Sequence, residues 1–347
     1  MIEVFSDQTA DQVWCKAIKA IMYGCNTKHQ KSRLGNTREL LHVNLNIKKP
    51  QQRWVLSRQP SINPAFAIAD IFWILSGAND AQFMNFWNPI LPRFAGHGST
   101  YHGAYGYRIR KQFGIDQLER AFHILKHNPE SRQVIIQIWD PKIDLPSQNG
   151  SPVSPDIPCN LCSMPKIREG KLEWFQIMRS NDIYRGTPYN LVQFTTLQEI
   201  LAGWLGVELG GYYQVSDSLH IYDSDLPKLE ILPQKRSINN NDQLGIGKKE
   251  FDVILKLICI LMTKLTEDTL TRKEFDAICN APDLPVSYRN LLLIAAADSA
   301  RRRDWIDEMN VVATDCTNPV LSIAWQSWQK RWCETANFVE PNLAKSI

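Results

Sequence analysis

The sequence predicts an α+β protein whose C-terminal part is entirely helical. Three observations lead to this prediction. Alternating or β-branched stretches predict strands at 40–48, 132–139, 171–180 and the end of 210–222. Apolar residues at spacings of three and four predict helices between these strands. Beyond about residue 245 only the helical pattern remains. We therefore expect a catalytic domain over 1–245 and a helical extension over 246–347 that packs on the core.

The helices that we expect in the first part cover 8–25, 64–76, 115–127 and 190–204. The segment PAFAIADIFWILS at 64–76 is apolar apart from one acid, Asp70. Residues 141–158 contain five prolines and the sequence SQNGS, which predicts a loop.

The extension shows three further helical signals. The stretch VILKLICILM at 253–262 predicts a buried helix, and TRKE at 271–274 is a capping box for the next helix. A stripe at helical spacing, which we interpret as core, consists of Trp325, Trp328 and Trp332.

The composition excludes few classes of protein. The 347 residues are 44% hydrophobic and carry a net charge of +3, which gives no argument for a nucleic-acid or membrane partner. No apolar run approaches the length of about 20 residues that a transmembrane helix needs. The first residues lack a signal-peptide pattern, so we expect a cytoplasmic protein. The eight cysteines are scattered, and Cys159-x-x-Cys162 has no second pair, so we expect reduced thiols and no metal.

The segment 158–190 holds residues that can form one reactive site. Cys159 follows the proline-rich loop and precedes a predicted strand, a place from which a side chain can reach a cleft. A cysteine becomes a nucleophile where positive charge or donors stabilise its thiolate; otherwise it is usually a small buried hydrophobe. Arg33, Arg132 and Arg179 each lie beside small or turn-forming residues. Arginine suits bidentate phosphate binding, although each of the three also fits an ordinary surface charge.

Nine short motifs follow one another in a familiar order. They are R-x-G at 33–35, DIFWIL at 70–75, AYGYRIR at 104–110, GIDQL at 114–118, NPESR at 128–132, PC at 158–159, RSND at 179–182, GTPYN at 186–190 and HIY at 220–222. In order and spacing they resemble the thymidylate synthase family from about residue 8 to residue 235. The resemblance implies a mixed, twisted sheet backed by helices, two copies of which pack back to back in a homodimer.

The resemblance also implies roles for individual residues. Cys159 resembles the nucleophile that adds to C6 of dUMP, and Tyr105 the tyrosine that helps to remove the C5 proton. Asp70 and Asn160 stand at catalytic positions that the family fills with glutamate and histidine. The implied nucleotide ligands are Arg33, Arg132 from the partner subunit, Arg179, Ser180, Asn190, His220 and Tyr222. The implied cofactor is 5,10-methylenetetrahydrofolate, with Asp182 and Gly186 on its side of the site.

Other departures from the family weaken the folate half of the site. Gln133 replaces a phosphate-binding arginine, Met164 replaces a glutamine, and LPRF at 91–94 replaces the tryptophans that pack on folate. The closing C-terminal segment of the family is not recognisable. We expect a thymidylate synthase that converts dUMP to dTMP. The alternatives are a hydroxymethylase, in which water quenches the C5 methylene, and an inactive nucleotide-binding protein.

Overall fold

The computed structural model describes residues 2–32, 34–233, 238–281 and 283–336. Its strands are β1 (Glu3–Asp7), β2 (Lys28–Ser32), β3 (Gly35–Ile47), β4 (Arg58–Gln59), β5 (Ile136–Gln137), β6 (Asn160–Arg168), β7 (Lys171–Asp182), β8 (Glu208–Tyr222) and β9 (Glu230–Ile231). Its α-helices are α1 (Ala10–Tyr23), α2 (Pro64–Ser76), α3 (Ala81–Trp87), α4 (Pro92–Ala95), α5 (Tyr105–Tyr107), α6 (Gln117–His127), α7 (Pro141–Asp144), α8 (Thr187–Leu205), α9 (Lys248–Lys264), α10 (Arg272–Cys279), α11 (Val286–Arg302), α12 (Ile306–Asp315) and α13 (Pro319–Ala336).

The main sheet is mixed, as the family resemblance implies. Its strands follow the order β1-β3-β8-β7-β6-β5, with β2 paired to β3. Strand β8 runs antiparallel to β3 but parallel to β7. Because β7 and β8 are parallel, their carboxyl ends lie at the same edge of the sheet. Side chains at the ends of these two strands therefore meet.

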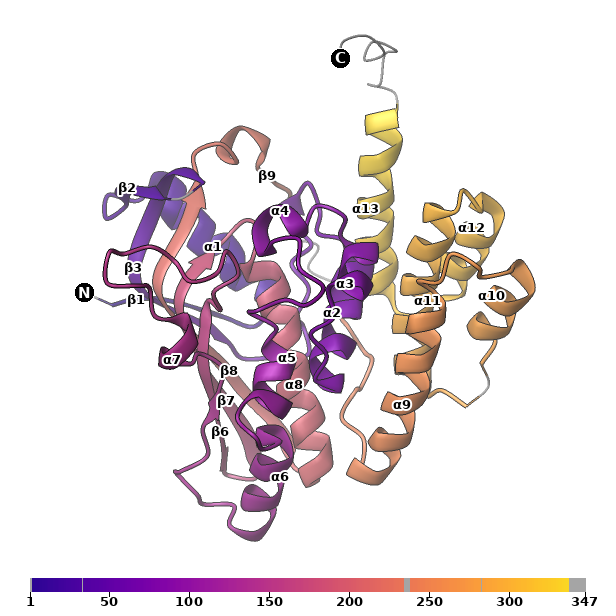
Figure 1. Cartoon of the computed structure of the whole chain (residues 1–347), viewed down its shortest axis with the longest axis horizontal. Helices are drawn as coiled ribbons and strands as arrows, with labels where there is room; N and C mark the ends of the chain where they lie inside the picture. Colours follow the sequence, from indigo (N-terminus) through magenta and orange to yellow (C-terminus); the bar gives the residue numbers. More distant parts are fainter. Residues whose placement is uncertain (1, 33, 234–237, 282, 337–347) are drawn as a thin grey trace.

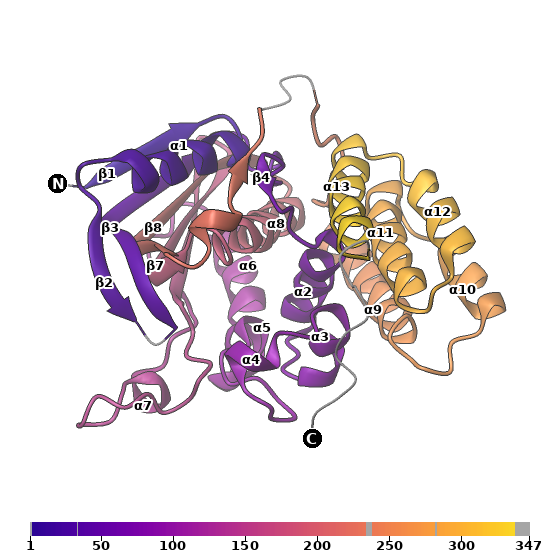
Figure 2. The same cartoon turned by 90° about the horizontal axis from the view of Figure 1, so that it is seen from above.

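Helices lie in two further layers beyond the sheet. Figures 1 and 2 show α2 and α8 between the sheet and the helices α9–α13. Helix α2 begins where Asn63 accepts a hydrogen bond from the Phe66 amide at 3.2 Å, and it ends at Gly77, whose φ is 66°. Every residue from Pro64 to Leu75 is buried, because α2 contacts α8 on one side and α9, α11 and α13 on the other. Asp70 therefore lies in the interior.

The C-terminal helices share one continuous hydrophobic core with the rest of the described chain. The predicted capping box at α10 is confirmed, since the side chains of Thr271 and Glu274 each bond the other's backbone amide. Trp325 and Trp328 are buried, whereas the side chain of Trp332 lies outside the described residues. The prediction of a buried helix at 253–262 is only half right, because Val253 is 65% exposed on the outer face of α9. The domain division at residue 245 stays a prediction.

Two predictions for the middle of the chain need correction. The strand expected over 132–139 is limited to β5, because only Ile136 and Gln137 pair with β6. The expected loop at 141–158 begins with the short helix α7. Asp140 caps this helix by accepting from the Lys142 amide at 3.0 Å, and Pro141 fits its first position. Neither β1 nor the fully exposed strand β2 was predicted from the sequence.

Candidate active site

Cys159 lies directly before β6, half-buried, with a guanidinium beside it. The Arg179 amide donates to the Cys159 carbonyl at 2.9 Å, which couples the start of β6 to the end of β7. The Arg179 side chain donates to the carbonyls of Pro158 (2.9 Å) and Ile157 (3.0 Å), and its Nη2 lies 4.0 Å from the Cys159 Sγ. A cation held next to a partly exposed sulfur is the environment that nucleophilic cysteines use.

Residues at the carboxyl ends of β7 and β8 lie side by side. Asp182 is in register with His220 across the two strands. The Ser180 hydroxyl is 3.5 Å from the His220 Nδ1, and the His220 and Tyr222 rings pack edge to face with centroids 5.5 Å apart. This edge of the sheet thus brings together hydroxyl, imidazole and phenol groups that the sequence alone placed 40 residues apart.

Asn190 projects from the first turn of α8 and is oriented by a residue that the sequence analysis missed. Its Nδ2 donates to the Asn181 Oδ1 at 3.3 Å, and the Thr187 hydroxyl donates to the same oxygen at 2.9 Å. The Asn181 Nδ2 in turn donates to Ser216 on β8 at 3.3 Å. Asn190 is 7% exposed, so its amide is fixed at the inner end of the site. Gly186 precedes this turn as the N-cap of α8.

An interior polar cluster surrounds the Tyr105 hydroxyl. Burial raises the pKa of Tyr105, the charge of Cys159 raises it further, and the nearby Asn160 side chain lowers it. Asp70, from α2, also acts on Tyr105. Burial raises the pKa of Asp70 to about 7, although a hydrogen bond from the Gln193 Nε2 opposes this shift. The four residues for which the family resemblance implies catalytic roles therefore lie around the Tyr105 hydroxyl: Tyr105 itself, Cys159, Asn160 and Asp70.

Gln193 is a second residue that the sequence analysis missed. It lies three residues after Asn190 on α8, and residues at this spacing share a face of a helix. The spacing could have placed Gln193 on the same face of the helix as Asn190. It could not have identified the partner of Gln193, Asp70, which lies 123 residues away in the chain.

Asp182 lies deeper than a surface acid. Its Oδ1 accepts from the amides of Tyr184 (2.9 Å) and Arg185 (2.8 Å), and burial raises its pKa against these bonds. The Arg185 guanidinium lies 3.8 Å from the Asp182 Oδ2 and bonds Asp225 at 2.6 Å. It also lies 4.5 Å from the Tyr222 ring centre and 5.6 Å from that of Phe94. The segment 91–94 therefore brings an aromatic ring to this side of the site in place of the tryptophans.

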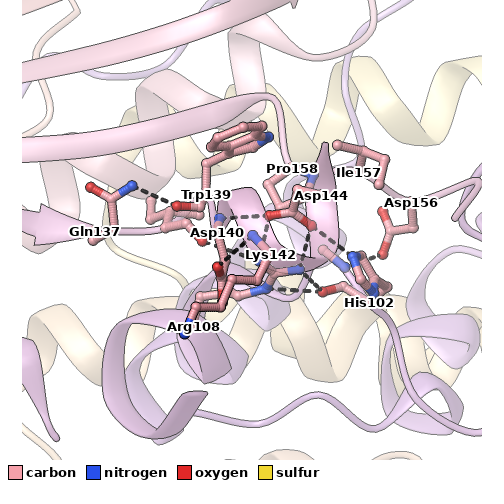
Figure 3. A network of polar contacts seen from close by, with 12 residues as sticks. His102, Arg108, Gln137, Trp139, Asp140, Lys142, Asp144, Asp156, Ile157 and Pro158 are labelled. Carbon is pink, nitrogen blue, oxygen red and sulfur yellow. Dashed lines mark hydrogen bonds and ion pairs between the residues drawn. The ribbon is translucent and has the colours of Figure 1, made fainter. Parts of the chain in front are cut away.

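Figure 3 shows a polar network in which Arg108 and His102 both contact Asp144. Arg108 is 1% exposed and binds both carboxylate oxygens of Asp144, at 2.6 and 3.0 Å. His102 contacts the same carboxylate at 2.7 Å, and the Gly103 amide donates to Asp156 at 2.7 Å. Burial raises the pKa of Asp144, but hydrogen bonds from Arg108, the Asp140 amide and His102 outweigh it and lower the pKa. The turn before Tyr105 is thereby tied to the loop that ends at Cys159.

The remaining predicted ligands of the nucleotide are placed less completely. Arg132 is exposed in the turn after α6, and the structure contains a single chain, so its supply to a partner subunit stays a prediction. Arg33 lies outside the described residues. Within the described ranges, no three His, Cys, Asp or Glu side chains form a group that could hold a metal ion. No helix in these ranges is both long and apolar enough to cross a membrane.

The fold and the site define a class that comparison with known proteins identifies. Residues 12–259 match the model of the family described as thymidylate synthase. The chain belongs to the thymidylate synthase family.

Several curated proteins are similar to this chain. The deoxyuridylate hydroxymethyltransferase of Bacillus phage SP01 is 37% identical over 54% of the chain and 51% of its own length. A protein of the same name from Delftia phage PhiW-14 is 30% identical over 65% of the chain and 64% of its length. The thymidylate synthase of Bacillus licheniformis is 34% identical over 48% of the chain and 60% of its length. The chain thus spans about half the length of the first of these relatives.

Proposed function

We propose that this protein transfers a one-carbon unit from 5,10-methylenetetrahydrofolate to C5 of dUMP. The observation that carries the proposal is the convergence of Cys159, Arg179, Asn190 and Tyr105 at one edge of the sheet, from four separate segments. Such a set offers a nucleophile, an anion ligand, a base reader and a proton-transfer group.

The nucleotide fits this edge with its phosphate towards Arg179 and Ser180. The Nη1 amine of Arg179 has no hydrogen-bond partner among the described residues, and the side chain is exposed, so it remains for an anion. Arg33 and the partner subunit's Arg132 complete the phosphate site in the proposal. His220 and Tyr222 bind the sugar 3′-hydroxyl. Asn190 reads the base, because its amide offers one donor and one acceptor to the O4 and N3 edge of uracil.

Cys159 supplies the covalent step. Its thiolate adds to C6 of the pyrimidine, which makes C5 an enolate-like carbon that attacks the one-carbon unit. Tyr105 assists the removal of the C5 proton, and its position beside Cys159 and Asn160 supports this role. Asp70, with a pKa of about 7, is suited to exchange protons near neutral pH.

The residues on the Asp182 side fit a folate. The Asp182 carboxylate is partly exposed, and its Oδ2 accepts neither of the two backbone amides that bond the Oδ1, so it suits the N–H donors of a pterin ring; Phe94 offers an aromatic face. Asp182 and Gly186 would hold the cofactor there. Bound methylenetetrahydrofolate supplies the one-carbon unit and, for a methyl product, the hydride.

Two products are candidates. The first is dTMP, the expectation from the sequence. The second is 5-hydroxymethyl-dUMP, which is favoured by a buried amide atom next to Asp70, the Gln193 Oε1, that has no hydrogen-bond partner among the described residues.

A homodimer is part of the proposal. The sheet face that carries Phe175 and Tyr213 is in register across β7 and β8 and is only partly buried. A half-apolar sheet face of this kind needs a covering surface, and a second copy would also bring Arg132 to the phosphate site.

Incubation of the purified protein with dUMP and methylenetetrahydrofolate, followed by mass spectrometry of the nucleotide, tests the proposal. A methyl or hydroxymethyl group on the base supports it. An unchanged nucleotide, with both ligands shown to bind by calorimetry, overturns it in favour of an inactive binding protein.

A further inference from the structure

A buried amide group next to Asp70 carries an atom without a hydrogen-bond partner among the described residues. Gln193 is 6% exposed; its Nε2 donates to the Asp70 Oδ2, whereas its Oε1 has no partner. Asn160 is fully buried; its Oδ1 accepts from the Gln176 Nε2 at 2.9 Å, and its side chain is a hydrogen-bond partner of the Tyr105 hydroxyl. Buried polar atoms in proteins nearly always have a partner, often an ordered water. The unpartnered Gln193 Oε1 indicates that a small polar molecule completes the cluster.

The position of the Gln193 Oε1 places such a molecule next to the Asp70 carboxylate. Oε1 belongs to the same amide group as the Nε2 that contacts Asp70, so a water bonded to Oε1 lies within reach of the carboxylate. Asn160 approaches the same point from β6, because its side chain and the charge of Asp70 both act on the Tyr105 hydroxyl. Cys159, which acts on that hydroxyl as well, puts the reacting carbon atoms nearby.

We propose that Gln193 is a positioning residue that orients the Asp70 carboxylate and, through its Oε1, holds the water that adds to the one-carbon unit on C5 of the nucleotide. This inference rests on the proposed one-carbon transfer and selects the hydroxymethyl product. Its chemistry involves no oxidant or reductant. The water oxygen bonds to the exocyclic methylene carbon, and the water proton passes to Asp70. The methylene π pair moves into the ring, so that C5=C6 forms as the C6–Sγ bond breaks and the Cys159 thiolate leaves.

The lengths of the two side chains explain why this site needs Gln193. Aspartate is one methylene shorter than the glutamate that the family resemblance leads us to expect at residue 70. The longer Gln193 side chain reaches from α8 to the shorter Asp70 side chain, and its Nε2 fixes the position of the Asp70 carboxylate. An amide also suits both protonation states: it donates to a carboxylate, and after turning over it accepts from a carboxylic acid.

That dual capacity matters because Asp70, with a pKa of about 7, exists in both forms near neutral pH. The titratable groups that face it are Tyr105 and Tyr189, whose pKa values burial and the Asp70 charge both raise. Neither supplies a positive charge that would hold Asp70 ionised, so Gln193 is the side chain that favours its charged form.

The test compares two glutamines of α8. Gln193→Met removes the amide while keeping a long side chain. Gln198→Met is the matched control, because Gln198 is also buried on the same helix and also has an Oε1 without a partner among the described residues, but its Nε2 bonds the backbone of β7 and β8 instead of Asp70. Both variants are incubated with dUMP, methylenetetrahydrofolate and 2-mercaptoethanol, a thiol that traps an exocyclic methylene which water has not reached.

We expect Gln193→Met to lower the yield of hydroxymethyl nucleotide at least about tenfold and to raise the thiol-trapped product, as the loss of a positioned water and its base predicts. The dUMP affinity, measured by calorimetry without folate, should change less than about threefold, because Gln193 does not touch the nucleotide in this account. Gln198→Met should leave the ratio of the two products unchanged even if it melts at a lower temperature. In a crystal structure of the dUMP complex, a water should bridge the Gln193 Oε1 and Asp70.

A second pair of variants keeps the proposal testable if Gln193→Met does not fold. Gln193→Asn shortens the amide and should lose hydroxymethyl product. Asp70→Glu combined with Gln193→Asn restores the summed length and should recover the product to within about threefold of the wild type, the usual signature of coupled positions. Failure of this rescue overturns the positioning role.

The outcomes separate this inference from the proposed function. A wild-type protein that makes no C5-substituted product overturns both. A wild type that makes only dTMP leaves one-carbon transfer standing and overturns the water site. Hydroxymethyl product with an unchanged ratio in Gln193→Met likewise overturns the water site alone.

Discussion

The buried carboxyl of Asp70 makes the folding stability of the protein depend on pH in a predictable direction. Burial raises its pKa from an ordinary value near 3.8 to about 7. Between these values the folded state keeps a proton that the unfolded state has released. The contribution of the neutral Asp70 carboxyl to the free energy of unfolding is therefore complete below pH 3.8 and is lost as pH rises through about 7. Asp70→Asn replaces the carboxyl with a group of similar shape that cannot ionise.

The expected size of the effect follows from the same two values. One pKa unit corresponds to about 1.4 kcal/mol. Between pH 5 and pH 8 the wild type should lose about 2.5 kcal/mol of unfolding free energy through Asp70. Asp70→Asn should not lose it, so the variant should gain on the wild type by that amount over this range. Catalytic turnover should fall in the variant at every pH.

Urea unfolding of the ligand-free protein, followed by tryptophan fluorescence at pH 5 and pH 8, measures this difference. Glu130→Gln is the control, because Glu130 lies in the exposed turn after α6 and its loss should give a nearly constant difference. If the free-energy difference between Asp70→Asn and the wild type changes by less than about 0.5 kcal/mol, the usual effect of an ordinary surface substitution, the carboxyl is not held neutral by burial and the account of Asp70 is wrong.

Three further predictions concern the nucleophile, the base and the C-terminal helices. Cys159→Ser should abolish turnover but keep dUMP binding within about tenfold, because a hydroxyl is far less ionised than a thiol; Cys162→Ser should keep most activity, and its inactivity would point instead to a paired-cysteine site. Asn190→Asp should shift preference from dUMP towards dCMP by at least about tenfold in competition assays, since mispaired buried polar groups cost about 1–3 kcal/mol; an unchanged ratio would remove Asn190 from the base site. Leu292→Ala, at a fully buried position of α11, should cost about 2–5 kcal/mol in denaturant unfolding, whereas Val253→Ala on the exposed face of α9 should cost little; equal effects would contradict a shared core.

Segments with strong local signals were predictable from the sequence. Helix α2 has the predicted bounds because Pro64 suits its first turn and Gly77 takes up the left-handed conformation that ends it. Helix α8 and strand β7 extend by at most three residues beyond their predicted ends. Strand β2, KHQKS, has no apolar alternation because all its residues are exposed, and only pairing with β3 makes it a strand.

The site was predictable in its motifs but not in its supporting contacts. The motifs located Cys159, Arg179 and Asn190. These three residues lie within a short stretch of the chain and contact other residues of the same stretch. The contact from Gln193 to Asp70 spans 123 residues, and that from Arg108 to Asp144 spans 36. Neither pair has a local pattern, because only the packing of α8 on α2 and the turn of α7 bring the partners together.

The central claim, that Cys159 adds to C6 and C5 then accepts the one-carbon unit, is tested most directly with 5-fluoro-dUMP. Fluorine cannot leave C5 as a proton does, so the reaction should stop with nucleotide, one-carbon unit and folate all attached to the protein. Peptide mass mapping after incubation with methylenetetrahydrofolate should find this adduct on Cys159 and none on Cys162. An adduct on another residue, or no adduct while both ligands bind, would contradict the claim.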